Sequence, residues 1–344
     1  MASIPSTEPE LDELLSHPRP ATVEALRAAP GDVVVLGAGG KMGPTLARMV
    51  ARAAEQADGA KRRRVIAVSR FSAAGAESAL HEAGVETIRC DLLDRRAVVR
   101  LPEAPNVIYM AGQKFGTTEA PSRTWMHNVV VPALCAARYE RSRIVAFSTG
   151  NVYPLVPVAS GGATEATPVA PVGEYAASCV GRERVFEHYA AARGTRVAIV
   201  RLNYAIDLRY GVLVDLAMAI LDERPIPLAM GHVNVIWQGD ANRAAIELLP
   251  LAATPPLVVN VTGGEVLAVQ DLARELARRL DREARFDGNP ARDALLSDTT
   301  RMRSLLAAPE MRAETMLDLV AEWMRAGRPL LGKPTHFETR DGAF

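Results

Sequence analysis

Residues 33–47 read VVVLGAGGKMGPTLA, a short apolar run followed by a glycine-rich turn and the start of a helix. A turn of this kind lets the backbone approach a pyrophosphate, and the following helix directs its positive N-terminus at that anion. The spacing G-x-x-G-x-x-G is met by Gly37, Gly40 and Gly43. The stretch predicts a dinucleotide site. An ordinary glycine-rich turn is the alternative, weakened by the strand before it and the helix after it.

The chain after this turn alternates between β-type and helical patterns. Strands separated by helices predict a parallel, doubly wound sheet with right-handed crossovers. The fold class is therefore α/β, a Rossmann-type doubly wound parallel sheet with a smaller C-terminal α/β substrate lobe. The expected strands cover residues 65–69, 86–89, 106–110, 143–147 and 196–202, and the expected helices 42–54, 75–83, 122–139 and 175–192.

Three regions follow from this pattern. Residues 1–30 form an N-terminal helical extension, and residues 31–203 form the dinucleotide-binding domain. Residues 204–344 are mainly the substrate-binding lobe, from which strand 257–261 returns to the sheet. The helices expected in this last region cover residues 214–221, 241–249, 269–280, 300–306 and 313–326.

The composition excludes several classes of function. Forty basic and forty acidic side chains cancel, and only one short basic run, residues 61–64, stands out, so neither nucleic acid nor an anionic membrane is expected as a partner. The three cysteines are irregularly spaced, which predicts neither disulfides nor a metal site and suits a reducing compartment. With no secretory leader and no run near the ~20 apolar residues of a membrane span, a cytoplasmic protein is expected.

The order of motifs resembles the extended short-chain dehydrogenase/reductases, in particular the NAD-dependent epimerase/dehydratase family, over about residues 32–306. The resemblance rests on landmarks spread along the chain. They are the glycine turn, Asp91-Leu92, Ala111-Gly112, Asn128, the segment FSTGNVYP at 147–154, Tyr175, the segment QGD at 238–240 and the segment VNVTG at 259–263.

The resemblance and the second strand together suggest the cofactor. NAD-specific relatives end that strand with an acidic residue, whereas this chain has Ser69-Arg70, which suits a 2′-phosphate and favours NADP over NAD. The resemblance implies that Asp91 hydrogen-bonds the adenine and Leu92 covers its ring, although Asp91 is also placed to cap a helix over residues 93–99. The expected cofactor-binding residues are Gly37, Gly39, Gly40, Lys41, Met42, Gly43, Ser69, Arg70, Asp91, Leu92, Ala111 and Gly112.

The catalytic residues implied by the resemblance are incomplete. Thr149 matches the hydroxyl that orients the substrate oxygen, Tyr175 matches the acid/base, and Asn128 supports them. The family's lysine, four residues after the tyrosine, is replaced by Cys179. A phenol titrates near pH 10, so its use as a base near neutrality needs a neighbouring positive charge.

Three interpretations of this gap remain open. In the first, Lys114, one of only four lysines in the chain, reaches the site and supplies the charge and a substrate contact. In the second, Tyr175 acts only as a hydrogen-bond donor in ketone reduction. In the third, catalysis is lost, and the protein is a catalytically silent NAD(P)-binding regulator or scaffold.

The substrate side is less defined. Where the family's sugar dehydratases carry an Asp-Glu pair, this chain has Gly150-Asn151, which disfavours dehydration and leaves oxidation, reduction or epimerisation. Asn203 follows a sheet strand where relatives contact substrate, so it is expected to bind substrate. The resemblance implies a sugar-like or nucleotide-sugar small molecule in carbohydrate metabolism, and a homodimer formed through the helices that carry Asn128 and Tyr175.

Overall fold

A seven-stranded parallel sheet organises the protein in the computed structural model, which describes residues 4–59, 63–72 and 75–343. Its strand order is β12-β7-β5-β4-β1-β2-β3, so β1 lies inside the sheet between β2 and β4. The strands are β1 (Val33–Leu36), β2 (Val65–Ser69), β3 (Glu86–Arg89), β4 (Asn106–Tyr109), β5 (Arg143–Thr149), β7 (Arg196–Leu202) and β12 (Leu257–Val261). The predicted doubly wound α/β fold is confirmed.

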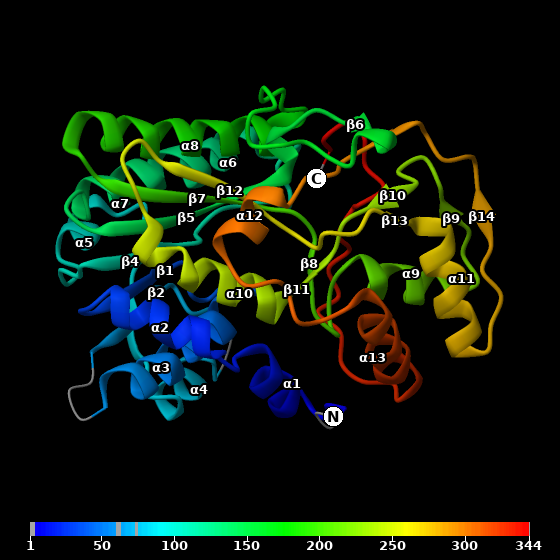
Figure 1. The fold of residues 1–344 in the computed structure, drawn as a ribbon, viewed down its shortest axis with the longest axis horizontal. Helices are drawn as coiled ribbons and strands as arrows, with labels where there is room; N and C mark the ends of the chain where they lie inside the picture. Colours follow the sequence, from blue (N-terminus) through cyan, green and yellow to red (C-terminus); the bar gives the residue numbers. More distant parts are fainter. Residues whose placement is uncertain (1–3, 60–62, 73–74, 344) are drawn as a thin grey trace.

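Both faces of the sheet are covered by helices, as Figure 1 shows. Val33 and Val35 of β1 pack into one hydrophobic cluster and Val34 and Leu36 into another, because successive strand side chains point to opposite faces. This double burial explains why β1 is apolar at every position. One face carries α2 (Pro20–Ala28), α3 (Gly43–Asp58), α4 (Ala76–Glu82), α10 (Gln238–Glu247) and α12 (Thr300–Leu305), and the other α5 (Arg95–Val99), α7 (Val131–Arg138) and α8 (Gly173–Arg193).

A second lobe lies beside the sheet, around a separate hydrophobic cluster. Its three helices are α9 (Val212–Leu221), α11 (Val269–Leu280) and α13 (Ala313–Arg325), and α1 (Glu8–Leu15) adds two leucines to the same cluster. Short strand pairs complete the region: β9 (Ile226–Pro227) with β14 (Phe286–Asp287), β10 (His232–Val233) with β13 (Leu267–Ala268), β8 (Ala205–Ile206) with β11 (Ile236–Trp237), and β6 (Val156–Pro157) with β15 (Asp293–Ala294).

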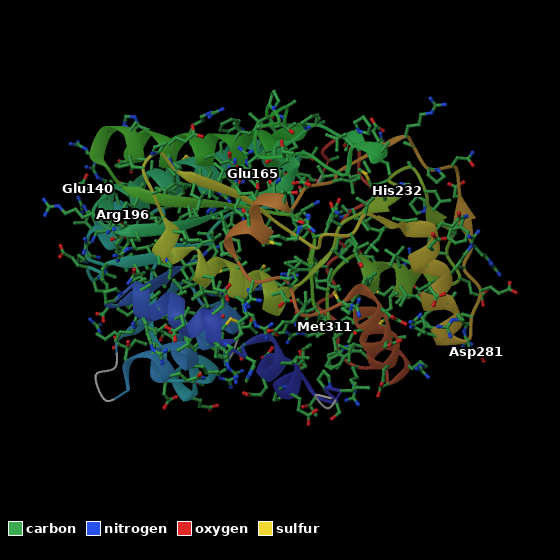
Figure 2. All side chains as sticks on the ribbon, viewed as in Figure 1. Glu140, Glu165, Arg196, His232, Asp281 and Met311 are labelled. Atoms are coloured by element: carbon green, nitrogen blue, oxygen red, sulfur yellow. The ribbon has the colours of Figure 1, made fainter. Side chains whose placement is uncertain are left out.

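The strand β12 joins the sheet from within the second half of the chain. It pairs in parallel with β7, with Val259 opposite Val200. At this edge Glu165, labelled in Figure 2, accepts a hydrogen bond from the backbone N–H of Asn260 at 2.8 Å. The loop between β5 and α8 is thereby fastened to the last strand of the sheet.

The C-terminal segment, residues 329–343, runs back between the two lobes (Figure 1). The backbone N–H of Thr335 donates to Asp215 in α9 at 2.8 Å, and Arg340 pairs with Asp293 at 2.6 Å. Phe337 is only 4% exposed. The segment therefore contacts both the second lobe and, through the neighbouring site described below, the sheet domain.

Two sequence features need only brief comment. The basic run at residues 61–64 lies partly outside the described residues; its Arg63 pairs with Asp58 at 2.6 Å. Among the residues described, no helix combines the length and the apolar character that crossing a bilayer needs.

Candidate functional site

The glycine turn between β1 and α3 forms a tightly packed cradle at the carboxyl end of the sheet. Gly37 has φ +87°, and a Cβ built on it would lie 2.6 Å from the backbone N of Ala111. A Cβ on Gly43 would lie 2.3 Å from the carbonyl O of Ala38. Only glycine fits where backbone meets backbone at these distances, and the opening helix offers its N-terminus. These residues fit the pyrophosphate of a dinucleotide.

The end of β2 lies against this cradle. A Cβ on Gly39 would be 2.5 Å from the Ser69 Oγ, so the serine hydroxyl borders the glycine turn. Arg70 is exposed and makes no ion pair with any residue that the structure describes. Its charge reaches His127, where burial first and then Arg70 lower the pKa of the imidazole. The edge of the cradle therefore presents a hydroxyl and an available guanidinium.

The helix cap considered for Asp91 belongs to a different aspartate. Asp94 caps α5 by accepting from the backbone N–H groups of Arg96 and Ala97. Asp91 is exposed and accepts the backbone N–H of Leu93 at 3.0 Å in a tight turn. Leu92 is 8% exposed within the cluster on the α5 face of the sheet. Asp91 is thus free of a capping duty.

A cavity of about 400 Å³ brings the glycine turn and the expected catalytic residues together. From the expected set it is lined by Gly37, Gly40, Lys41, Met42, Gly43, Gly112, Lys114, Thr149, Tyr175 and Asn203. Gly39, Ser69, Arg70, Asp91, Leu92, Ala111 and Asn128 lie outside its lining. A second cavity, of about 410 Å³, is lined partly by Arg209 and Asp215, and Lys333 of the C-terminal segment lines both.

Thr149 and Tyr175 meet in this cavity. Thr149 ends β5, and its Oγ1 accepts the backbone N–H of Asn151 at 3.2 Å. Tyr175 lies in the first turn of α8. Burial raises the pKa of the Tyr175 phenol far above its usual value, and the neighbouring Cys179 adds to this, whereas the charge of Arg182 and a hydrogen bond with Thr149 lower it. Burial therefore favours the neutral form of the phenol, and the charge of Arg182 and the hydrogen bond with Thr149 oppose it.

Two lysines reach the same cavity. The Lys114 Nζ donates to the carbonyl of Thr335 in the C-terminal segment at 3.0 Å, and burial lowers its pKa to about 8. The Lys41 Nζ donates to the carbonyl of Ala205 at 3.1 Å and lies 3.7 Å from the centre of the Tyr210 ring. Burial lowers the pKa of Lys41 to about 7.

Asn128 supports the site from behind the cavity. It lies in a π-helical turn, η1 (Met126–Val130), between α6 (Pro121–Trp125) and α7. Such turns often occur at functional sites. Its Nδ2 donates to the Gln113 carbonyl and to the Ser178 Oγ, both at 2.9 Å, and its Oδ1 accepts the Gln113 backbone N–H at 2.8 Å. The side chain thus ties the loop after β4 to α8.

The residue that sequence analysis missed is Arg182, seven positions after Tyr175 in α8. Its Nη2 donates to the Asn128 Oδ1 at 2.7 Å and its Nη1 to the Phe147 carbonyl at 2.9 Å. A Cβ on Gly112 would lie 2.3 Å from this Nη2, so the glycine makes room for the guanidinium. The only signal in the sequence was helical spacing, since residues 175, 179 and 182 fall on one helix face.

A buried ion pair fixes the end of β5. The Glu183 carboxylate accepts a hydrogen bond from the Ser148 Oγ at 2.5 Å and two from Arg201 nitrogens at 2.7 and 3.0 Å. Arg201 also donates to the Tyr153 hydroxyl at 2.8 Å. One residue beyond β7, Asn203 is 2% exposed; its Nδ2 donates to the Leu295 carbonyl at 3.3 Å while the side chain borders the cavity.

Solved structures share this fold at low sequence identity. The UDP-glucose 4-epimerase of Thermotoga maritima with UDP-glucose is 18% identical, with a TM-score of 0.68, and the match covers 86% of this chain and 99% of that one. MoeE5 in complex with UDP-glucose and NAD is 18% identical, with a TM-score of 0.69, and the match covers 86% of this chain and 99% of that one. DesIV, a dTDP-glucose 4,6-dehydratase from Streptomyces venezuelae with NAD bound, is 20% identical, with a TM-score of 0.70, and the match covers 86% of this chain and 97% of that one. No curated protein sequence matches the chain.

The sequence profile of one family spans the sheet domain. It matches residues 33–206, from the first residue of β1 to the end of β8, and so includes the glycine turn, Thr149, Tyr175 and Asn203. The match covers more than half of the 344 residues. The chain therefore belongs to the NAD dependent epimerase/dehydratase family.

Proposed function

We propose that the protein is an NAD(P)-dependent oxidoreductase or epimerase that acts on a carbinol or ketone carbon of a sugar-like substrate. One observation carries this proposal. The Thr149 and Tyr175 side chains interact within the same cavity that the glycine cradle lines. Two hydroxyl groups beside a dinucleotide cradle suit the handling of one substrate oxygen during hydride transfer.

Each residue has a proposed task in this scheme. A bound dinucleotide would supply the hydride acceptor or donor. Thr149 orients the substrate oxygen, Tyr175 exchanges a proton with it, and Lys114 and Asn203 bind the substrate. Asn128 positions the helix that carries Tyr175, because it joins Gln113 to Ser178. Oxidation followed by reduction on the other face of the carbon would give epimerisation.

NADP is proposed as the preferred dinucleotide. Ser69 borders the glycine turn, and the exposed Arg70 pairs with no carboxylate among the described residues. A guanidinium matches phosphate oxygens with two parallel hydrogen bonds, whereas the carboxylate used for a ribose hydroxyl would repel them. The solved MoeE5 and DesIV complexes contain NAD, so NAD is the competing outcome.

A sugar-like substrate is proposed from the family, and two of the solved relatives are bound to UDP-glucose. A homodimer is also proposed. Trp125, Met126 and Val130, which surround Asn128 in sequence, are 40%, 44% and 36% exposed. Apolar side chains exposed side by side favour contact with a second copy. Sedimentation analysis tests this, and Met126→Glu should shift a dimer toward monomer.

A catalytically silent regulator is the alternative. The feature that favours it is Cys179, because the thiol stands where the family's lysine would lie, and it contributes to a raised pKa of Tyr175. Such a protein would bind dinucleotide and change its affinity for a partner with the redox state of that dinucleotide.

Thermal unfolding with NAD, NADH, NADP and NADPH, combined with mass analysis of nucleotide released on denaturation, tests the binding step. A ligand at about 100 times its Kd adds about 2.7 kcal/mol to the free energy of unfolding. Stabilisation by the phosphorylated pair supports Ser69 and Arg70 as a 2′-phosphate site. Retained NAD supports an internally recycling epimerase. No stabilisation and no retained nucleotide refutes the proposal.

Turnover separates the enzyme from the regulator. Candidate sugars and nucleotide sugars are incubated with the stabilising dinucleotide, and absorbance of the reduced cofactor and epimer formation are followed. Tyr175→Phe should abolish turnover while leaving dinucleotide binding intact. The matched control is Tyr189→Phe, on the same helix but outside the cavity lining, which should retain turnover.

A further inference from the structure

We propose that Arg182 is a positioning residue whose guanidinium charge prepares the Tyr175 phenol for proton transfer, a role that rests on the hydride-transfer function proposed above. In the oxidative direction, the O–H bond of the substrate breaks and its proton moves to the Tyr175 oxygen. The carbinol carbon simultaneously loses a hydride to the oxidised dinucleotide. In reduction the Tyr175 O–H bond breaks instead and its proton goes to the substrate oxygen. Both directions require a phenolate at one end of the step.

The geometry of α8 brings the cation to the phenol. Tyr175, Cys179 and Arg182 are spaced by four and three residues, so they lie on one face over two turns. Long helical side chains lean toward the N-terminus, which directs the guanidinium back toward Tyr175. The charge thus arrives one turn beyond the position where the family's lysine would stand.

The guanidinium is buried without a neutralising carboxylate. Arg182 is 5% exposed, and its hydrogen bonds go to the Phe147 carbonyl and the Asn128 amide oxygen, which are both uncharged. Among the described residues no carboxylate lies within ion-pair distance of it, since the adjacent Glu183 pairs with Arg201. Its Nε has no hydrogen-bond partner within the described part of the chain.

Such an arrangement is costly for folding. Burying a charge that has no counter-ion is unfavourable, and an arginine does not lose its proton to escape that cost. The full positive charge therefore remains in the site. The groups that gain from it are those that become negative nearby, and Tyr175 and Cys179 are both among them: Arg182 lowers the pKa of each against the opposing effect of burial.

The surroundings accommodate this one side chain. Gly112 leaves the space that the Nη2 occupies, and the Tyr109 ring faces the guanidinium, with its centre 5.9 Å from the Arg182 Cζ. Arg182 does not line the cavity, so it would not touch a substrate bound there, and it is assigned a positioning role through Tyr175. Lys114, by contrast, lines the cavity itself, and its ammonium donates to Thr335 across it.

Direct titration of residue 175 tests the proposal without a known substrate. Difluorotyrosine, a more acidic analogue, replaces Tyr175 in the full-length protein, and fluorine NMR follows its ionisation with pH. Arg182→Gln keeps a hydrogen-bonding side chain but removes the charge, so ionisation should move up by about one pH unit, a tenfold loss of acidity. Arg182→Lys keeps the charge and should stay near the parent value, although it loses the two-pronged hydrogen bonding.

One control and two further variants make the outcome decisive. Arg184→Gln removes an exposed arginine from the same helix and should leave the titration unchanged. If Arg182→Gln does not fold, Asn128→Asp places a carboxylate on the Nη2 and should shift the titration in the same direction. An unchanged titration in the folded variant overturns the proposal, and so does a full shift caused by Lys114→Met instead.

The result is distinguishable from failure of the proposed function. If the parent protein binds no dinucleotide, hydride transfer is refuted, yet the titration still reports whether Arg182 controls the phenol. If dinucleotide binds and the titration ignores Arg182, only the role of Arg182 is lost. With a substrate in hand, the pH profile of kcat should shift upward in Arg182→Gln and return toward the parent in Arg182→Lys.

Discussion

Removing Arg201 should destabilise the protein far more than removing an ordinary arginine. Glu183 and Arg201 have side chains that are 2% and 7% exposed, and the carboxylate takes two of its three hydrogen bonds from Arg201. In Arg201→Met, Glu183 keeps only the hydrogen bond from Ser148, and its buried carboxylate loses its ion-pair partner. Breaking a buried pair from one side costs about 3–5 kcal/mol. At about 4 kcal/mol the folded-to-unfolded ratio falls roughly a thousandfold.

Urea unfolding followed by circular dichroism measures this loss. With an m-value of about 3 kcal/mol per molar, the midpoint should fall by about 1.3 M. The double variant Glu183→Gln/Arg201→Met removes the charge as well and should recover most of the stability. The matched control is Arg184→Met, whose exposed pair with Glu187 should be worth less than about 1 kcal/mol. If Arg201→Met loses less than about 1 kcal/mol of the free energy of unfolding, Glu183 does not depend on Arg201 for its burial, and the reasoning is refuted.

Three further outcomes are expected. Because folding lowers the pKa of Lys41 from 10.5 to about 7, the unfolded chain binds more protons between these values, and stability should rise with pH across that window. Urea unfolding at pH 7 and pH 9 gives the free energy of unfolding at each pH, and the gain between them should be about 1–2 kcal/mol smaller in Lys41→Met, after allowing for partial exposure of the lysine. Phe337→Ala should lower the free energy of unfolding by about 3 kcal/mol, because the ring is 4% exposed, whereas Phe115→Ala, at 37% exposed, should cost little; equal losses in calorimetry would contradict this. Gly112→Ala places a Cβ 2.3 Å from the Arg182 Nη2 and should cost about 1–3 kcal/mol, and wild-type stability would mean that the guanidinium is not fixed there.

The central sheet was predictable because its strands carry their own signals. Residues 33–36 and 65–68 are apolar runs bounded by turns or polar residues, which is the pattern of strands buried on both faces. The two-residue strands of the second lobe, such as β9 and β14, are too short to show any period. Their pairing depends on how the lobe packs, and sequence alone does not contain that.

The parts of the site that follow fixed sequence spacings were predictable. Glycines 37, 40 and 43, together with Thr149 and Tyr175, follow fixed spacings, and the cavity brings them together. Arg182 was not predictable, because its main partner, Asn128, lies 54 residues earlier in the chain and in a π-helical turn that the sequence does not announce. The alternative role of Asp91 as the cap of α5 was wrong, because Asp94 caps that helix. Both residues are aspartates near the start of the helix, so only the path of the backbone decides which one caps it.

The contact between the C-terminal segment and the cavity was equally hidden. The Thr335 carbonyl accepts a hydrogen bond from the Lys114 ammonium, although the two residues are 221 positions apart. No local sequence pattern links them. Such contacts follow from the path of the chain between the lobes, and they explain why a tail without an assigned role lines the candidate site.

Because β12 lies far along the sequence, truncating the chain before it would leave the sheet incomplete. The family profile ends at residue 206, yet the sheet ends with residues 257–261 paired along β7. A fragment stopped at residue 206 would expose the backbone N–H and C=O groups of β7, a seven-residue and mostly apolar strand, and such an edge is a template for pairing with other chains. Such a fragment should precipitate or form sheet-rich aggregates on expression, although it holds the whole glycine cradle together with Thr149, Tyr175 and Arg182.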